Sequence, residues 1–397
     1  MSEELSVKEK LKILQNTAIK ELEKKNGENS YFLGAKKIPK VPLICSSGSI
    51  GLDVALGIGG FPANRIIEIG GQESSSKTTL TLINIAEIQK KGKLCAYVDA
   101  EQSFDPSWAK KMGVNVDELL IVQPDTAEDA FESLYKIMDS GVVSYIVVDS
   151  TNALIPRKVF ESDTAGDATM GLGARIISME LPKVQRKCTE HNCTVVFISQ
   201  IRATMDKYHP EAIGIGNAMK FWASVRLKTA RAEVEKDDGE EGQSKVDVKI
   251  TVFKNKIAVP FRKAQFTLFT GEGGRFGIDT SKEILEFAVR FDVVKKTGSW
   301  YSYKEEKLGQ GFDNVRKYFE ANPSIFEEVK IQIYKKLEEE REKDVSMSDS
   351  FESELDKAIE ENAEGKTRKR RTKETAGEAS IELDESKISE GEVVAES

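Results

Sequence analysis

Short apolar runs alternate with segments of helical periodicity between about residue 40 and residue 270. The first four runs are almost continuously apolar, as in strands that are buried on both faces of a parallel sheet. Later runs alternate apolar and polar residues, as in Lys249-Ile250-Thr251-Val252, which favours an antiparallel extension of the sheet. Helices between the strands make βαβ units, so the pattern predicts an α/β fold with a mostly parallel central sheet. The predicted strands cover residues 66–69, 94–98, 145–148, 194–198, 224–227, 248–253 and 264–269.

The pattern changes on both sides of this core. Residues 4–25 place Leu11, Leu14 and further apolar residues on one helical face, which predicts an amphipathic N-terminal helix. A polar stretch follows this helix, so two roles stay open: docking on a neighbouring molecule, or capping its own body. Residues 275–340 predict a small, helix-rich C-terminal domain, and beyond Asp344 the rise in charge predicts disorder. The expected divisions are 1–38, 39–272, 273–343 and 344–397.

Composition narrows the class of protein. The chain of 397 residues carries a net charge of −8, but residues 345–397 hold 15 acidic and 8 basic residues. The rest of the molecule is therefore close to neutral and has room for local basic surfaces. No apolar run approaches the roughly 20 residues that a transmembrane helix needs. The acidic N-terminus also lacks the features of a secretory signal, so the sequence predicts no membrane association.

Cysteine usage points to a reducing setting. Four cysteines in a chain of this length do not indicate a disulfide framework, so we expect a cytoplasmic protein. Cys188, His191 and Cys193 lie close together, yet no fourth zinc ligand follows them. A helix end that leads into a buried strand explains these residues better than a metal site.

The most informative chemistry follows the first predicted strand. Residues 71–79 form a loop of small and polar residues that ends in Lys-Thr-Thr and precedes a helical segment at 80–86. Strand, loop, Lys-Thr and helix in this order predict a P-loop, in which backbone N–H groups face a phosphate. Lys77 would reach the β- and γ-phosphates of ATP, and Thr78 would bind Mg²⁺. The alternative is a polar turn that happens to end in Lys-Thr.

One P-loop position departs from the usual pattern, because Ser76 stands where glycine normally precedes the lysine. A Cβ there needs either a tolerable φ or a wider loop. The expected nucleotide-binding residues of the loop are Gly71, Gln72, Glu73, Ser74, Ser75, Ser76, Lys77, Thr78 and Thr79.

Three further strands end in polar side chains: Glu101 follows the second strand, Asp149 ends the third and Gln200 follows the fourth. Ligands of α/β sheets bind at the carboxyl ends of strands, so we expect these groups near the P-loop. Glu101 has the chemistry to deprotonate a water that attacks the γ-phosphate, although a residue that caps the next helix is the simpler reading. Asp149 suits Mg²⁺, and Gln200 suits the sensing of a γ-phosphate at the start of a loop over 201–215.

The amino-acid sequences of these segments, and the order in which they occur, resemble those of the bacterial RecA recombinase family. The resemblance covers about residues 45–325 and implies a RecA-type P-loop ATPase core, an N-terminal helix that docks on the next protomer and a small α+β C-terminal domain. The matching pieces lie at residues 47–49, 52–57, 73–75, 99–101, 105–106, 123–126, 147–150, 170–172, 200–202, 216–218, 223–227, 254–258 and 300–303.

The resemblance also implies roles at the nucleotide. It makes Glu101 the general base, Gln200 the γ-phosphate sensor and Asp149 the carboxylate on the Mg²⁺ side, beside Lys77 and Thr78. The implied cofactors are ATP and Mg²⁺.

Two further pairs receive roles from the same resemblance. Asp105 and Trp108 would flank the adenine. Lys254 and Lys256 would reach the ATP of the neighbouring protomer and neutralise charge in the transition state. From the sequence alone, two lysines on the solvent face of an edge strand are the favoured reading, and the resemblance reverses this preference.

Nucleic acid would lie against two loops, at 161–171 and 201–216. The resemblance implies partners that are single-stranded DNA, homologous double-stranded DNA and further copies of the chain in a helical filament, with single-strand-binding and loader proteins as additional candidates. Mostly phosphate contacts predict binding with little sequence preference and strong salt dependence. The implied DNA-binding residues are Met170, Arg175, Ser178, Arg202, Gly216 and Asn217.

Departures from the family pattern leave alternatives open. Besides Ser76, Ile215 stands where glycine is common, and Pro182 stands where a DNA-contacting arginine is common, with Lys183 or Arg186 as substitutes. The departures suggest a divergent and phage-encoded member. The leading interpretation is a DNA-dependent ATPase that forms filaments on single-stranded DNA and catalyses pairing and strand exchange. A non-exchanging accessory or mediator protein is the runner-up, and a hexameric helicase motor the third option.

Overall fold

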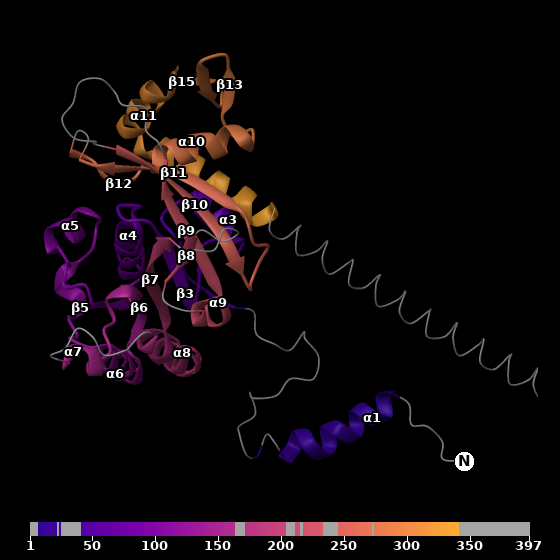
Figure 1. Cartoon of the computed structure of the whole chain (residues 1–397). Helices are drawn as coiled ribbons and strands as arrows, with labels where there is room; N and C mark the ends of the chain where they lie inside the picture. Colours follow the sequence, from indigo (N-terminus) through magenta and orange to yellow (C-terminus); the bar gives the residue numbers. More distant parts are fainter. Residues whose placement is uncertain are drawn as a thin grey trace, which may run out of the picture.

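The computed structural model describes residues 7–21, 24, 41–162, 171–203, 211–214, 217–232, 245–271 and 274–340. Within these residues a ten-stranded mixed sheet forms the centre of the molecule (Figure 1). The spatial order is β12 (Phe276–Ile278), β11 (Lys263–Thr270), β10 (Lys245–Asn255), β9 (Val225–Arg231), β3 (Ile66–Gly71), β7 (Thr194–Ala203), β6 (Val143–Asp149), β4 (Leu94–Asp99) and β5 (Leu119–Val122), and β8 (Glu211–Ile213) pairs with β7 outside this order.

The sheet has a parallel part and an antiparallel part. Strands β9, β3, β7, β6, β4 and β5 are parallel neighbours, whereas β10, β11 and β12 extend the sheet with antiparallel pairs. This arrangement confirms the predicted mostly parallel core with an antiparallel extension. Strands β5 and β8 were not predicted: β5 is an apolar run of only 4 residues, too short to distinguish a strand from a helical segment, and β8 has only three residues.

Helices cover both faces of the parallel part. The helices α4 (Lys77–Gln89) and α5 (Pro106–Lys111) lie on one face, and α6 (Ala127–Asp139), α8 (Leu172–Glu190) and α9 (Ala218–Trp222) lie on the other. Helix α3 (Ile50–Leu56) packs against β10 and β11 of the antiparallel extension. In β6, Tyr145 and Val147 belong to the first apolar cluster, and Ile146 and Val148 belong to the second. Burial of successive residues on opposite faces explains why this strand has a continuous apolar sequence.

Shorter elements complete the core. A separate two-stranded sheet joins β1 (Leu43–Cys45) to β2 (Phe61–Pro62), and a short helix α7 (Arg157–Phe160) follows β6. Within the ranges given above, no helix is long and apolar enough to cross a membrane.

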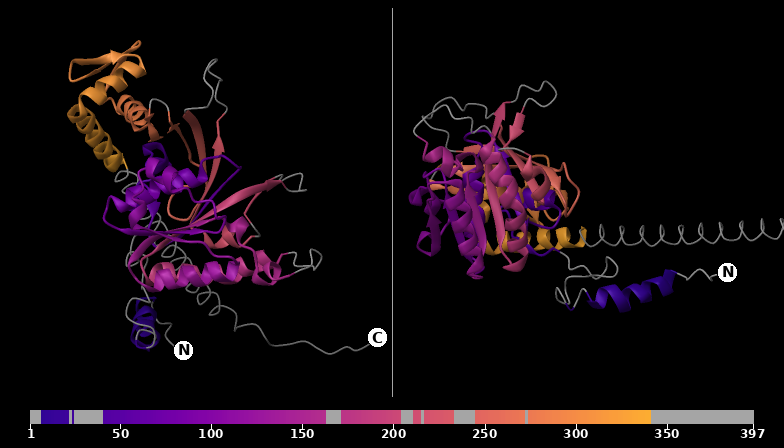
Figure 2. Two further views of the ribbon diagram at one scale, coloured as in Figure 1. Left: turned by 90° about the vertical axis from the view of Figure 1, so that its left-hand side faces the viewer. Right: turned by 60° about the horizontal axis from the view of Figure 1, so that its bottom comes forward.

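The C-terminal domain lies beyond the antiparallel end of the sheet (Figures 1 and 2). It has its own apolar cluster and combines helices with a three-stranded antiparallel sheet, so the predicted α+β composition is confirmed. Its elements are α10 (Thr280–Arg290), β13 (Lys295–Thr297), β14 (Trp300–Tyr303), β15 (Glu306–Gln310), α11 (Phe312–Ala321) and a further helix over 323–340.

A buried carboxylate joins this domain to the ATPase core. Glu283 of α10 accepts hydrogen bonds from the Ser49 hydroxyl at 2.6 Å and from the Gly51 backbone N–H at 3.1 Å, at the start of α3. Burial raises the pKa of Glu283 to about 7, against the lowering effect of these hydrogen bonds. The side chain therefore caps a helix of the core from outside it.

The N-terminal helix is present as predicted. Helix α1 (Val7–Leu14) continues into a π-helical turn at Gln15–Ile19, and both lie apart from the sheet in Figures 1 and 2. Its side chains Leu11, Ile13 and Leu14 are 40%, 50% and 46% exposed. The predicted disorder beyond Asp344 falls outside the described residues and stays a prediction.

Candidate active site

The P-loop connects β3 to α4 through a tight turn. The hydroxyl of Ser75, which is buried, donates to the Gln72 carbonyl oxygen at 2.7 Å and lies 2.8 Å from the Thr229 hydroxyl of β9. A Cβ at Gly71 would lie 2.2 Å from the Thr229 Oγ1, so no side chain fits there without displacement. The loop is thus held from the neighbouring strand as well as from within.

Ser76 resolves the question that the sequence left open. It adopts φ 65° and ψ 25°, in the left-handed region. The serine therefore adopts, at φ 65°, the small left-handed region that glycine normally occupies at this position. For an L-residue this conformation costs roughly 1–2 kcal/mol.

Lys77 begins α4 and turns back over the loop. Its Nζ donates to the Gln72 carbonyl oxygen at 2.7 Å. Burial lowers the pKa of Lys77, and the carboxylates of Asp149, Glu101 and Glu73 act in the opposite direction. A half-buried ammonium that has one carbonyl partner and faces three acids is suited to exchange that carbonyl for a phosphate oxygen.

Asp149 lies at the end of β6, opposite the start of α4. Its Oδ2 accepts hydrogen bonds from the Tyr97 hydroxyl at 2.6 Å and from the Thr78 hydroxyl at 2.8 Å. Burial raises the pKa of Asp149, whereas the hydrogen bonds from Tyr97 and Thr78 lower it. The structure therefore brings together the two residues that the sequence assigned to a metal ion.

Glu101 and Gln200 meet at the same edge of the sheet. Glu101 Oε1 accepts from the Ser150 hydroxyl at 2.5 Å and from Gln200 Nε2 at 3.1 Å. Both Glu101 and Gln200 are exposed, so a nucleotide and a water can reach them. The side chains of the predicted base and the predicted sensor are thus in direct contact.

The predicted adenine residues lie beside α4. The indole Nε1 of Trp108 donates to the Thr79 hydroxyl at 3.3 Å, and its ring meets Phe276 edge-on at a centroid distance of 6.1 Å. Asp105 caps α5 by accepting from the Ser107 N–H at 2.8 Å. Both residues have a local structural role next to the P-loop helix.

Lys254 and Lys256 are not part of this cluster. They extend from β10 to the C-terminal end of α9, where Lys254 Nζ donates to the carbonyl oxygens of Lys220 and, at 3.3 Å, of Phe221. Lys256 Nζ also donates to the Phe221 carbonyl oxygen, at 2.9 Å. Burial, followed by the charges of Lys256 and Arg226, lowers the pKa of Lys254 to about 8.

The predicted DNA-binding residues are partly described. Arg175 and Ser178 are exposed on α8, and Asn217 is exposed just before α9. The backbone of Arg202 lies in β7. Met170, Gly216 and the side chain of Arg202 fall outside the described residues.

Pro182 stands inside α8. Of its proposed substitutes, Lys183 pairs with Glu180 at 2.9 Å and Arg186 pairs with Glu190 at 2.6 Å. Each cation is paired within its own helix.

The sequence did not predict a buried polar chain, a series of hydrogen-bonded side chains that runs beneath this edge through Thr151, Ser199 and Glu68. The Ser199 hydroxyl donates to the buried Glu68 carboxylate at 2.9 Å and lies 2.9 Å from the Thr151 hydroxyl. Glu68 also pairs with Arg226 of β9. Asn152 Oδ1 accepts from the Gln200 backbone N–H at 2.9 Å. The available signal was that polar residues directly follow the apolar part of β6 and the apolar part of β7.

The cysteine and histidine cluster has the structure that was expected. Cys188 and Cys193 are free and buried, where α8 ends and β7 begins. His191 Nε2 lies 3.1 Å from Asp139 Oδ1. In the part of the chain that the structure describes, no group of three potential ligands is placed to hold a metal ion.

Comparison with known proteins gives one consistent answer. The chain matches the RecA N-terminal domain over residues 12–275 and the RecA C-terminal domain over residues 282–338. It is 46% identical over 321 residues to "Protein RecA" of Leptospira biflexa, covering 80% of this chain and 81% of that protein. The corresponding protein of Cereibacter sphaeroides is 46% identical over 329 residues, covering 82% and 93%. These relatives are bacterial, and the predicted phage origin stays a prediction. The chain belongs to the RecA family.

Proposed function

We propose that the carboxyl edge of β3, β4, β6 and β7 is the site at which this chain hydrolyses ATP. RecA-family proteins are ATPases that depend on single-stranded DNA and catalyse homologous pairing and strand exchange, and the chain is such a recombinase. The observation that carries the assignment of the site is the contact of Glu101 with Gln200 at 3.1 Å, next to the P-loop. Base, sensor and phosphate loop share one edge of the sheet.

Lys77 holds the terminal phosphates together with the backbone N–H groups at the start of α4. A phosphate takes the place of the Gln72 carbonyl oxygen, which the ammonium already contacts at 2.7 Å. Ser74, Ser75 and Ser76 shape the loop around it, with Ser75 fixed by its bond to Thr229.

The residues present fit a Mg²⁺ ion. Asp149 and Thr78 offer a carboxylate and a hydroxyl oxygen that lie 2.8 Å apart, and Mg²⁺ binds such oxygen ligands together with substrate phosphates. The ion, when bound, neutralises charge on the β- and γ-phosphates. The hydrogen bond from Tyr97 keeps the Asp149 carboxylate oriented toward Thr78.

Glu101 accepts the proton of the attacking water. The hydroxyl of Ser150 and the amide of Gln200 both bond to Oε1, which leaves Oε2 free of these two contacts for the water. Gln200 donates to the γ-phosphate when ATP is bound, so its position depends on the state of the nucleotide.

Lys254 and Lys256 complete the site of the next copy in a filament. Phe221, whose carbonyl oxygen both lysines contact, and Phe261 are 70% and 71% exposed and provide apolar surface for such a contact. The γ-phosphate of one copy then receives positive charge from the next copy, so full turnover needs assembly.

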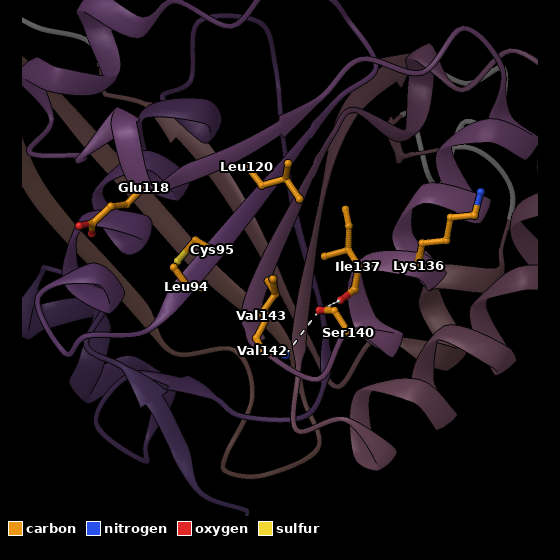
Figure 3. Close-up of a pocket in the computed structure, with 9 residues that line it drawn as sticks. All are labelled: Leu94, Cys95, Glu118, Leu120, Lys136, Ile137, Ser140, Val142 and Val143. Carbon is orange, nitrogen blue, oxygen red and sulfur yellow. Dashed lines mark hydrogen bonds between the residues drawn. The ribbon is translucent and has the colours of Figure 1, made fainter.

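The N-terminal helix supplies a second contact between copies. An apolar groove of about 390 Å³ lies at the free edge of the sheet, along β5 and the end of α6 (Figure 3). Its exposed walls include Leu94, Leu120 and Val142. We assign this groove to the exposed apolar face of α1 from an adjacent copy. Residues 1–38 then form the docking segment, 39–272 the core, 273–343 the C-terminal domain and 344–397 the tail.

DNA lies along the face that carries α8 and the start of α9. Arg175, Ser178, Arg202, Gly216 and Asn217 contact the phosphate backbone there. Met170 inserts between base triplets. Because the phosphate contacts are mostly ionic, binding weakens steeply with salt.

The test compares the purified chain with Lys77→Ala. The wild type is expected to hydrolyse ATP only slowly alone and much faster with single-stranded DNA, and Lys77→Ala is expected to lose this activity. A strand-exchange assay on the same preparations separates a recombinase from an accessory protein. DNA-stimulated turnover that survives in Lys77→Ala contradicts the assignment of the site.

A further inference from the structure

Strand β8 returns from the loop that follows Gln200 and lies over the strand that leads into the P-loop. Ile213 of β8 pairs with Ile201 of β7. Its side chain occupies the space above Gly70, where a Cβ would lie 2.2 Å from Ile213 Cγ2 and 3.3 Å from Ile213 Cβ. Gly70 lies inside a buried strand, and a glycine there marks a close approach by another part of the chain.

This contact cannot be relieved by a simple side-chain rotation. Isoleucine is branched at Cβ and has restricted χ1 freedom, and both its Cγ2 and its Cβ are close to Gly70. A side chain at position 70 therefore displaces the backbone of β8 as well as the side chain of Ile213.

The same strand holds Gln200 through the backbone. Gly214, the residue after Ile213, donates its N–H to the Gln200 carbonyl oxygen at 3.0 Å. A Cβ at Gly214 would lie 3.0 Å from both Glu68 Oε1 and Ser199 Oγ, so this turn also rests on the buried polar chain. Gln200 in turn donates to Glu101.

Ordinary core packing does not account for Ile213. The residue is only partly buried and belongs to none of the three apolar clusters, neither as a member nor as a residue packed against one. It lies instead against Gly70, which precedes Gly71 at the start of the P-loop. The contact thus joins the return strand of a DNA-facing loop to the nucleotide edge.

We propose that Ile213 is a positioning residue for ATP hydrolysis, and that the missing side chain of Gly70 leaves the space into which Ile213 packs. Ile213 does not touch the nucleotide. It fixes β8, and through Gly214 it fixes Gln200 at the distance from which the amide reaches Glu101. This inference rests on the proposed function, since it concerns the geometry of the same base and sensor.

The test is a size exchange between the two positions. Gly70→Ala pushes β8 outward and is expected to lower kcat of the DNA-stimulated ATPase by about tenfold to a hundredfold, with the KM for ATP little changed. Ile213→Ala removes the anchor and is expected to lower kcat by a similar factor. The double variant, in which the alanine at 70 fills the space left at 213, is expected to recover most of the wild-type kcat.

A second readout separates positioning from a loss of stability. In a Gln200→Ala background, Ile213→Ala is expected to cause no further loss of kcat, because it acts through Gln200. Ile213→Val, which keeps the Cγ2 methyl, is expected to retain most of the activity. Should Gly70→Ala fail to fold, these two variants and thermal unfolding of Ile213→Ala carry the test.

Two results overturn the proposal while leaving the function intact. One is a Gly70→Ala protein with the kcat of the wild type. The other is an Ile213→Ala effect of the same size with and without the Gln200 side chain. If the wild type itself shows no DNA-stimulated turnover, the proposed function fails instead.

Discussion

Two charged regions of this molecule differ in how their side chains are bonded. We call them the nucleotide edge, which holds Lys77, Glu101, Asp149 and Gln200, and the lysine edge, where Lys254 and Lys256 reach the end of α9. At the nucleotide edge, Asp149 receives hydrogen bonds from the hydroxyls of Thr78 and Tyr97, and Glu101 receives them from Ser150 and Gln200. The Glu101 backbone N–H donates to the Asp149 carbonyl oxygen at 3.1 Å and connects the two sets. At the lysine edge, Lys254 and Lys256 bond only to carbonyl oxygens at the end of α9 among the contacts that the structure gives for them. The acidic groups of the nucleotide edge accept hydrogen bonds from other side chains, whereas the cations of the lysine edge contact only backbone carbonyl oxygens among the contacts given above.

The difference indicates which parts of the proposed ATPase site one protomer supplies by itself and which it does not. A base, a sensor and a phosphate loop can be assembled within one fold, because parallel strands end at a common edge. Lys254 and Lys256 lie at the end of β10 and just after it, in the antiparallel extension and away from that edge. The proposed function therefore takes the positive charge for each nucleotide from a second copy.

The largest expected effect removes the base from the nucleotide edge. Glu101→Gln keeps the shape and hydrogen bonding of the side chain but not its proton affinity, so kcat is expected to fall by about 10²–10⁴-fold while ATP still binds. Single-turnover hydrolysis and nucleotide binding measure the two quantities. As a control, Glu132→Gln on the exposed face of α6 is expected to leave both unchanged. Normal turnover in Glu101→Gln means that the base lies elsewhere.

The next effect removes a cation from the lysine edge. Lys256→Ala is expected to keep the ATP affinity of a free protomer but to lower DNA-stimulated kcat by about 10²–10³-fold, since one charge-stabilising donor is lost. Lys249→Ala, which changes an exposed lysine of the same strand, serves as the matched control. Equal activity in the two variants removes the distinction between the edges.

A smaller effect concerns the proton of Lys254. Its lowered pKa of about 8 means that the ammonium loses its proton as the pH rises through that value, whereas contact with a triphosphate keeps it charged. Assembly then takes up a proton and is expected to weaken by about tenfold between pH 7 and pH 9. Light scattering or sedimentation with DNA and ATP measures assembly. Lys254→Arg, which stays charged, is expected to be flat over this range, and a parallel decline in both proteins contradicts the assignment.

The smallest effect tests strain at the nucleotide edge. Ser76→Gly relieves a left-handed serine and is expected to stabilise the fold by about 1 kcal/mol, seen as a rise in Tm. Ser76→Ala removes the hydroxyl but keeps the Cβ, so its Tm is expected to match the wild type. An equal rise in both variants assigns the effect to the hydroxyl instead.

Much of the fold could be predicted because burial on two faces leaves a clear trace in a strand such as β6. Strand β5 is also apolar throughout, but its 4 residues are too few to separate a strand from a helical segment, and its exposed Leu120 and Ile121 could not be foreseen from the sequence. The three residues of β8 are too few to show a period. Their places depend on pairing with distant strands, which a local pattern does not encode.

The residues of the site also divide into those that a local sequence pattern predicts and those whose contacts depend on distant strands. Glu101, Asp149 and Gln200 could be found because each follows an apolar run, and the structure puts them at one edge. Thr151 and Ser199 could not be paired from the sequence, since their contact depends on β6 and β7 being neighbours. Hydroxyl residues beside a strand end are also common in turns, so they carry little signal of their own.

Lys254 of β10 and the adjacent Lys256 already have hydrogen-bond partners in the single protomer. Under the proposed function, a copy that joins a neighbour exchanges these bonds to carbonyl oxygens for bonds to phosphate, so only the difference in free energy between the two sets favours joining. When the phosphate leaves, each ammonium returns to the carbonyl oxygens at the end of α9. The proposed function therefore implies that adding or removing a subunit at the end of a filament costs little free energy.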